Sequence, residues 1–206
     1  MPGIVLASRN PGKIREIRTM VAELGIDLLS LDDYPGIPEI AEDGKSFLEN
    51  ALKKARAVAE ATGEIVLADD SGLEVEALGG APGIYSARYA GNDADDRKNI
   101  RKLLRDMSGI SSEKRKAAFR CVLVLHHPDG SFETFEGRWE GRIAEEEAGE
   151  GGFGYDPVFF LPEEGMTVAQ LPPGIKNRIS HRARAFAKLK ERLQKREIKS
   201  GRSAAR

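Results

Sequence analysis

The first third of the chain alternates between short apolar runs and amphipathic stretches. Residues 4–7 and "EIVLAD" (64–69) are apolar runs of strand length. Residues 13–24 and "SFLENALKKARAVAEAT" (46–62) carry apolar residues at helical spacing, and Ser46 and Glu49 form the S-x-x-E pattern of a capping box. These patterns predict two helices and two buried strands, the second strand ending at Asp69-Asp70.

The pattern changes period further along the chain. "DADDRKNIRKLLRDM" (93–107) is typical of a helix with an acidic first turn. "KAAFRCVLVLHH" (116–127) and "SFETFEGRWEGRI" (131–143) read as long strands, and "PDG" between them predicts a tight turn. A last helix is expected from about Ser180 to Leu193. Helices and strands that alternate before a long hairpin favour a mixed, elongated α/β sheet over a closed barrel.

The composition of the chain argues against several classes of protein. The chain has 206 residues, 40% hydrophobic and 32% charged, with a net charge of −1. These values are ordinary for a globular domain, and the charge argues against general nucleic-acid binding. We expect neither a membrane span nor a signal peptide, because no long apolar stretch occurs. The single cysteine, Cys121, and three histidines have no zinc-site spacing, and cytoplasm is the simplest compartment.

The basic C-terminal end has no apolar periodicity. We therefore expect one domain over residues 1–195 and a disordered tail over 196–206. Nonspecific RNA contact through this tail is the alternative to a solvated segment.

A lysine occupies the first turn of the predicted helix at 13–24, where the helix dipole disfavours a cation. The loop "ASRNPGK" (7–13) leads from the strand into this helix, an arrangement that directs backbone N–H groups at the space before the helix. Ser8 and Asn10 add polar groups, and Lys13 adds a charge. The Walker spacing is absent. An anion site and a solvated turn are both compatible with this loop.

Two adjacent carboxylates follow the second strand in "LADDSG" (67–72). The carboxyl ends of strands are where open α/β sheets bind ligands, and Asp69 and Asp70 point to opposite faces if the strand continues. Asp70 can ligate Mg²⁺ or take a proton from water, whereas an Asp-Ser-Gly turn is the structural alternative. Glu42 and Asp43 become relevant if the fold brings them near Asp70.

Two further motifs have the chemistry of a nucleotide site. In "GGFGYDP" (151–157), Phe153 offers a stacking surface for a planar base and Asp156 can accept ring N–H groups. A glycine-rich corner before a strand is the alternative. In "ISHRARA" (179–185), Ser180 is an expected N-cap, and His181 and Arg182 again place cationic residues at a helix start. This recurrence favours a shared anionic ligand.

Together these segments resemble the inosine triphosphate pyrophosphatase family, in its bacterial dITP/XTP pyrophosphatase branch. The resemblance rests on "SRNPGK", "EDGKSFLENALKKA", "LADDSGLEVEALGGAPGIYSARYAG", "GGFGYDPVFF" and "SHRARA", in this order over residues 4–193. It implies an elongated mixed sheet with two α/β lobes and an active-site cleft between them. It also implies Mg²⁺-dependent hydrolysis of aberrant purine nucleoside triphosphates (ITP, dITP, XTP) to the monophosphate and pyrophosphate, by a homodimer without specific nucleic-acid or membrane partners.

The resemblance also implies roles for particular residues. Asp70 would be the catalytic acid–base and a metal ligand, with Glu42 as the second ligand of Mg²⁺. The residues implied in triphosphate binding are Ser8, Arg9, Asn10, Pro11, Gly12 and Lys13. Other implied substrate contacts are Lys54, Ser71, Lys176 and, as a cation near the phosphates, Arg88. The residues implied to hold or read the base are Phe153, Gly154, Tyr155, Asp156, His181 and Arg182.

The opening loop departs from the family pattern. The usual T-G-N-x-G-K becomes Ser8-Arg9-Asn10-Pro11-Gly12-Lys13, which keeps a hydroxyl and adds a bulky charge. Two other functions are carried forward: a nucleotide-binding regulator without catalysis, and an RNA-associated protein that uses the basic tail.

Overall fold

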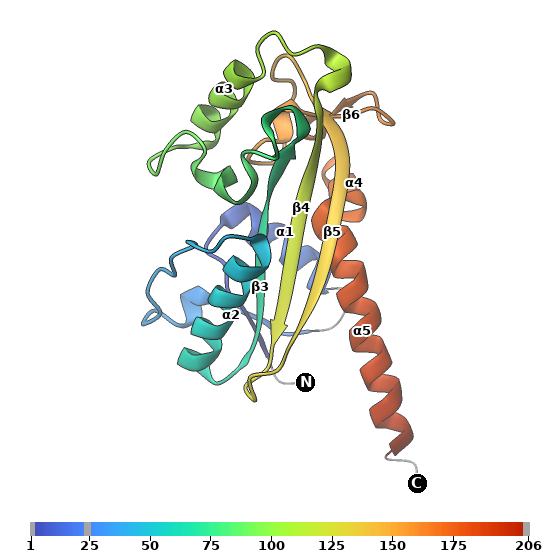
Figure 1. Ribbon diagram of the computed structural model, residues 1–206. Helices are drawn as coiled ribbons and strands as arrows, with labels where there is room; N and C mark the ends of the chain where they lie inside the picture. The colour runs from blue at the N-terminus through green and yellow to red at the C-terminus, as the bar shows by residue number, and fades with distance from the viewer. Residues whose placement is uncertain (1–2, 23–25, 204–206) are drawn as a thin grey trace.

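The computed structural model describes residues 3–22 and 26–203 and has a mixed α/β architecture built on one seven-stranded sheet (Figure 1). The strands are β1 (Ile4–Leu6), β2 (Leu28–Ser30), β3 (Ile65–Val75), β4 (Lys116–His126), β5 (Phe132–Ile143), β6 (Phe159–Leu161) and β7 (Met166–Thr167). The α-helices are α1 (Pro11–Ala22), α2 (Phe47–Thr62), α3 (Asp96–Asp106), α4 (Pro173–Ile179) and α5 (His181–Ser203). Short 3₁₀ helices η1–η6 lie at Leu31–Asp33, Glu76–Leu78, Gly83–Arg88, Ser112–Lys114, Asp156–Val158 and Val168–Gln170.

The sheet has the order β2-β1-β3-β4-β5-β6-β7. β1 pairs in parallel with β2 and β3, and all the other pairs are antiparallel. The three long central strands, of 11, 11 and 12 residues, make the sheet elongated, as predicted from the hairpin pattern (Figure 1).

The two faces of the central sheet are covered by different helices. Alternate residues of β3 point to opposite faces. Val66 and Ala68 pack with α2 in one apolar cluster, whereas Leu67 packs with α1 and α5 in another. A third cluster, around Trp139 and Phe159, fills the end of the sheet near α3. The side chains of any two neighbouring residues in the middle of β3 therefore lie on opposite faces of the sheet, in two separate environments.

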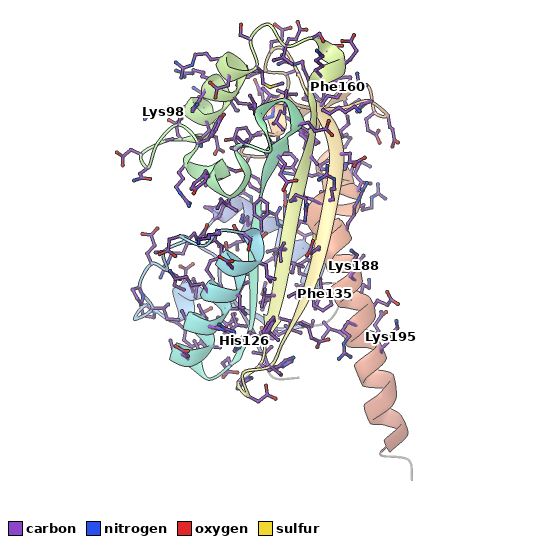
Figure 2. The ribbon with its side chains drawn as sticks, viewed as in Figure 1. Lys98, His126, Phe135, Phe160, Lys188 and Lys195 are labelled. Atoms are coloured by element: carbon purple, nitrogen blue, oxygen red, sulfur yellow. The ribbon has the colours of Figure 1, made fainter. Side chains whose placement is uncertain are left out.

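Helix α5 protects β5, which pairs with β6 only at Arg142 and Ile143. Lys188 Nζ of α5 donates to the Glu136 carbonyl at 2.6 Å, and Figure 2 shows Lys188 on the helix beside this strand. Arg184 Nη1 donates to the Arg138 carbonyl at 2.8 Å. These contacts satisfy strand carbonyls that lack a strand partner. Among the described residues, no helix is long and apolar enough to cross a membrane.

The predicted elements are present, with informative differences at their ends. Helix α1 starts at Pro11, a residue favoured at the first helical position, and the predicted end at Leu24 lies outside the described residues. In α2, the Ser46 hydroxyl accepts the Glu49 N–H at 3.1 Å, but the Glu49 carboxylate accepts the Lys45 N–H, so the reciprocal half of the capping box is displaced by one residue.

Two predictions from local pattern differ from the structure. The second buried strand does not stop at Asp69-Asp70, and no Asp-Ser-Gly turn forms, because β4 pairs with β3 through this region and keeps it extended to Val75. The last helix continues past Leu193 to Ser203, so residues 196–203 of the predicted disordered tail are helical. Lys, Arg and Glu have high helix propensity, which favours a helix in this stretch.

Candidate active site

The strand β3 carries Asp69 and Asp70 through the middle of the sheet, and their side chains point to opposite faces, as expected for a strand that continues. Asp69 meets residues of α1 and α5, whereas Asp70 meets residues of α2. Both residues are almost inaccessible to solvent, at 0% and 4%. Two buried carboxylates side by side in sequence thus have different partners and different chemistry.

Asp69 forms ion pairs with two cationic side chains. Its Oδ1 lies 2.8 Å from Lys13 Nζ, and its Oδ2 lies 3.3 Å from Arg182 Nε. Burial opposes the charged form, but Lys13 and Arg182 outweigh it and hold the pKa of Asp69 well below its usual range. Burial likewise opposes the charge of Lys13, but Asp69 and Asp70 raise its pKa. The cation at the helix start, which the helix dipole disfavours, is therefore held by a buried carboxylate.

The ion pairs continue from Arg182 towards the glycine-rich motif at residues 151–157. Arg182 Nη1 pairs with Glu16 of α1, and Glu16 Oε1 lies 2.8 Å from Lys176 Nζ. Lys176 in turn pairs with Asp156. These side chains alternate in charge, and all are at least nine-tenths buried, which a low-dielectric interior tolerates only when each charge has a partner.

The motif around Phe153 is held against the start of α1. A Cβ on Gly12 would lie 2.6 Å from the Phe153 ring, so glycine allows this close approach. Lys176 Nζ lies 4.3 Å from the ring centroid, a cation–π contact. The Phe153 N–H donates to Asp156 Oδ2 at 2.9 Å, and the Gly154 N–H donates to Asp96 Oδ2 at 2.7 Å. Asp156 thus accepts from the backbone and from Lys176.

His181 has an aromatic environment. Its ring stacks on Phe119 at 4.8 Å between centroids and lies 6.4 Å from Trp139. Burial, with Arg182 and Lys176 nearby, lowers the pKa of His181 well below its ordinary value, so the ring is neutral. Its Nδ1 is buried and has no hydrogen-bond partner in the described part of the chain. His181 therefore has hydrogen-bonding capacity to offer a ligand.

Asp70 lies in a different setting on the other face. Asn50 Nδ2 donates to its Oδ2 at 3.1 Å, and the Ser71 N–H donates to its Oδ1 at 3.0 Å. Lys54 Nζ is 3.9 Å from Asp70 Oδ1 and 2.5 Å from Glu42 Oε1. Burial raises the pKa of Asp70 to about 6, more than Lys54 lowers it. Such a carboxylate can exchange a proton near neutral pH.

The two sides open into adjoining cavities. One, of about 620 Å³, is lined by Lys13, Lys54, Asp70 and Glu42. The other, of about 90 Å³, is lined by residues of the glycine-rich motif and by His181. Asn10, Lys13, Ser71 and Ala87 line both. The first cavity has room for phosphates, and the second is flanked by the Phe153 and Phe119 rings.

Some predicted phosphate contacts have protein partners in the structure. Arg9 Nη2 donates to the Ile37 carbonyl at 2.7 Å, and Arg88 Nη2 donates to the Glu42 carbonyl at 2.7 Å, so both arginines hold the 37–42 segment at the rim of the larger cavity. Asn10 Oδ1 accepts the Lys13 N–H at 3.0 Å, which occupies one of the backbone donors expected to be free.

Other predicted residues are distributed as follows. Pro11 is exposed at the start of α1. The Tyr155 hydroxyl donates to the Ser86 carbonyl at 2.8 Å, so this residue supports the motif from within. Arg182 Nη2 donates to Ser71 Oγ at 2.8 Å, which engages the guanidinium on three sides together with Asp69 and Glu16.

Sequence reasoning missed four residues of the site: Glu16, Asn50 and Asp96 altogether, and Asp69 as the partner of Lys13. Glu16 had a usable signal, because it follows Lys13 by three positions and so lies on the same side of the helix. Asn50 is fully buried in the middle of an apolar helix face, which is unusual for an amide. Asp96 gave no signal beyond that of a helix-start acid.

Candidate metal ligands are the next feature of the site. No group of three or more His, Cys, Asp or Glu side chains that could hold a metal ion occurs among the described residues. Glu42 and Asp70 nevertheless converge on one ammonium, that of Lys54. Two carboxylates suit Mg²⁺, which usually takes one or two of them and completes its shell with phosphate oxygens and waters.

Comparison with known proteins agrees with this arrangement. The model of the Ham1 family matches residues 4–192. A relative from Geobacter sulfurreducens named dITP/XTP pyrophosphatase is 52% identical over 193 residues, which cover 94% of this chain and 97% of the relative. A relative of the same name from Bacillus subtilis is 47% identical over 194 residues, covering 94% and 98% of the two chains.

Solved structures give the same result. A HAM1 protein from Coxiella burnetii superposes with a TM-score of 0.87 at 42% identity, over 95% of this chain and all of that one. The nucleoside-triphosphatase, or dITP/XTP pyrophosphatase, from Mycobacterium abscessus superposes with a TM-score of 0.75 at 45% identity, over 91% and 97% of the two chains. The resemblance found in the motifs is thus confirmed, and the chain belongs to the Ham1 family.

Proposed function

We propose that this protein hydrolyses aberrant purine nucleoside triphosphates (ITP, dITP and XTP) to the monophosphate and pyrophosphate, and so removes them before they enter DNA or RNA. Relatives named dITP/XTP pyrophosphatase that are 47–52% identical over more than nine-tenths of the chain support this reaction. The activity requires an anion site, a proton acceptor and a base pocket that adjoin one another.

The observation that carries the proposal is the position of Asp70. Its carboxylate lines the larger cavity, beside Lys54 and Glu42, and its pKa is raised to about 6 by burial. A carboxylate with this pKa, facing a cavity large enough for a triphosphate, can take a proton from an attacking water. Asp70 is the catalytic residue in this proposal.

The charge of the triphosphate is balanced by the cations that line the larger cavity. Lys13 lies at the junction of the two cavities, and Lys54 lies next to Asp70. Arg9 and Arg88 each have further N–H groups at the cavity rim beyond the one given to a carbonyl. Glu42 and Asp70 would hold Mg²⁺. When bound, Mg²⁺ neutralises charge that develops on the phosphate oxygens.

The chemical step follows from these positions. Asp70 accepts a proton from the water whose oxygen bonds to the α-phosphorus, while the bond between that phosphorus and the bridging oxygen breaks. Pyrophosphate leaves with its charge held by Lys13, Lys54 and the arginines. Removal of the base should lower turnover by about 100-fold or more, as is typical of a lost general base.

Selection of the base follows from hydrogen-bond polarity. Hypoxanthine and xanthine present a 6-oxo acceptor, where adenine presents an amino donor. Neutral His181 lines the smaller cavity, and its Nδ1 has no partner among the described residues. With its proton on Nδ1, this ring would donate to the 6-oxo group. A donor facing an amino group would be unpaired, a mismatch that can cost 10⁴-fold or more. The reading of the base by Arg182 stays a prediction, because its donors are engaged with protein acceptors.

The assembly and location of the enzyme are further parts of the proposal. We propose a homodimer, as the family resemblance implies, and a cytoplasmic enzyme, since its substrates are cellular nucleotides.

The test is pyrophosphate release from ITP, XTP, dITP, ATP and GTP, each with Mg²⁺ and with EDTA. Mg²⁺-dependent release from the first three, with little from ATP, supports both the reaction and the base pocket. GTP shares the 6-oxo acceptor, so its rejection must come from its 2-amino group. Equal release from all five would keep the chemistry and refute the base account. Nucleotide binding without release from any would favour a regulator that has kept the fold without the catalysis.

A further inference from the structure

Lys54 occupies the space between the two carboxylates that are expected to hold the metal ion. Its Nζ lies 2.5 Å from Glu42 Oε1 and 3.9 Å from Asp70 Oδ1, and it also donates to the Asp69 carbonyl at 2.8 Å. Its side chain is 10% exposed, so it is fixed at the wall of the cavity and does not move freely in solvent. Glu42 lies in a loop and Asp70 lies in β3, and the Lys54 ammonium is near both carboxylates.

A cation held in this way competes with a second cation for the same oxygens. The ammonium donates to Glu42 Oε1, one of the two carboxylate oxygens through which Glu42 would hold a divalent ion. The positive charge of Lys54 would also repel a divalent ion bound near Asp70, and the partly buried surroundings screen this repulsion less than water does. The free protein therefore already neutralises much of the charge that attracts metal.

A triphosphate changes this balance. Its oxygens are strong acceptors for an ammonium, and Lys54 lines the same cavity as Lys13 and Arg88, where the phosphates are proposed to lie. Once Lys54 donates to phosphate oxygens, Glu42 Oε1 is released, and the phosphates bring further ligands for the metal.

We propose that Lys54 is a resident cation that closes the Glu42–Asp70 pair to free divalent metal, so that the metal enters together with the nucleotide and not before it. Lys54 thus has two successive partners, the carboxylates in the free enzyme and the phosphates in the complex. This inference rests on the proposed function, because it requires a triphosphate in the larger cavity.

The chain provides a matched control for a test. Lys53 precedes Lys54 on α2 and pairs with Asp43 at 2.5 Å, but both of these side chains are largely exposed, at 43% and 71%, and neither lines the cavity. Lys53→Gln and Lys54→Gln therefore remove the same charge from the same helix. Only Lys54→Gln removes it from the Glu42–Asp70 pair, while leaving an amide that can donate to a carbonyl.

The experiment measures Mn²⁺ binding without nucleotide, by electron paramagnetic resonance, for the wild type and both variants. Lys54→Gln should bind Mn²⁺ at least about tenfold more tightly than the wild type and Lys53→Gln, as expected when a group that acts on metal ligands is altered. Adding Glu42→Gln to Lys54→Gln should abolish the gain. Equal affinity in the wild type and the two single variants, or a gain that survives Glu42→Gln, would overturn the proposal. If Lys54→Gln does not fold, Lys54→Met, which preserves the length of the stem, takes its place.

Failure of this inference can be told from failure of the proposed function. Mg²⁺-dependent pyrophosphate release from ITP by the wild type, with equal Mn²⁺ affinity in all three proteins, would refute the role of Lys54 and leave the reaction intact. Tighter Mn²⁺ binding by Lys54→Gln with no release from any nucleotide would show that Lys54 blocks the acid pair, would refute the reaction, and would overturn the coupled entry of metal and nucleotide.

Discussion

Replacing Asp70 with Asn should stabilise the folded protein at neutral pH, although Asp70 lies at the centre of the proposed site. Burial raises the pKa of this carboxyl to about 6, against 3.8 for an ordinary Asp. The folded state therefore binds the proton more tightly than the unfolded chain does, so the fold loses stability as pH rises from about 4 to about 6, and the full penalty is present above that range. A rise in pKa from 3.8 to about 6 corresponds to about 3 kcal/mol of folding free energy.

The amide does not recover all of this free energy. Asp70 now accepts from Asn50 Nδ2 at 3.1 Å and from the Ser71 N–H at 3.0 Å, on its two different oxygens. An Asn side chain has one oxygen, so one of these hydrogen bonds is lost, at a cost of about 1 kcal/mol. The net gain expected for Asp70→Asn at pH 7.5 is about 2 kcal/mol.

Urea unfolding in EDTA at pH 7.5 and pH 5 measures this gain. The penalty from ionised Asp70 develops between the unfolded and folded pKa values, from about pH 4 to about pH 6. At pH 5 roughly half of it is present, so the advantage of the variant should shrink to less than about 1 kcal/mol. Both proteins should have the same denaturant slope. An Asp70→Asn protein that is less stable than the wild type at pH 7.5 would refute this account of Asp70.

Three further substitutions test other parts of the site. Asp69→Asn should destabilise the fold by about 3–5 kcal/mol, measured by urea unfolding, because Lys13 and Arg182 lose their buried counter-charge. This effect has the opposite sign to that of Asp70→Asn. A change below about 1 kcal/mol would contradict it. Gly137→Ala places a Cβ 1.9 Å from the His181 carbonyl oxygen. We therefore expect thermal unfolding to show a loss of about 1–3 kcal/mol of stability. An unchanged melting temperature would show that α5 can move away freely. Asp96→Ala removes the acceptor of the Gly154 N–H. Steady-state kinetics should show a KM for ITP that is raised by about fivefold and a kcat that changes by less than a factor of about two. A lowered kcat at constant KM would argue against a positioning role.

The local sequence pattern was sufficient to predict which helices and strands form, but it was insufficient to predict where they end. Helix α2 is marked by its cap and apolar face, and β4 and β5 by their alternation and turn. The extension of β3 through Asp69-Asp70 depends on pairing with β4, roughly fifty residues away in sequence. Two acids, a serine and a glycine have low strand propensity, so only the long-range partner could reveal this continuation.

The site was predictable where its residues lie in motifs and unpredictable where they act through distant partners. The loop at Lys13, the acids and the glycine-rich motif were expected in one site, and the structure brings them to two adjoining cavities. The pairing of Glu16 with Arg182 joins residues 166 positions apart, and no local pattern specifies such a contact. The orientation of Arg9 towards the Ile37 carbonyl likewise depends on how a remote loop folds back.

The direct test of the central claim is the destination of the water oxygen. In the proposed reaction, Asp70 activates water for attack at the α-phosphorus, and pyrophosphate is the leaving group. Hydrolysis of ITP in ¹⁸O-water, followed by mass spectrometry of both products, should therefore place one ¹⁸O atom in the monophosphate and none in pyrophosphate. Label in pyrophosphate, or in inorganic phosphate released with a diphosphate, would place the attack at another phosphorus and contradict the account.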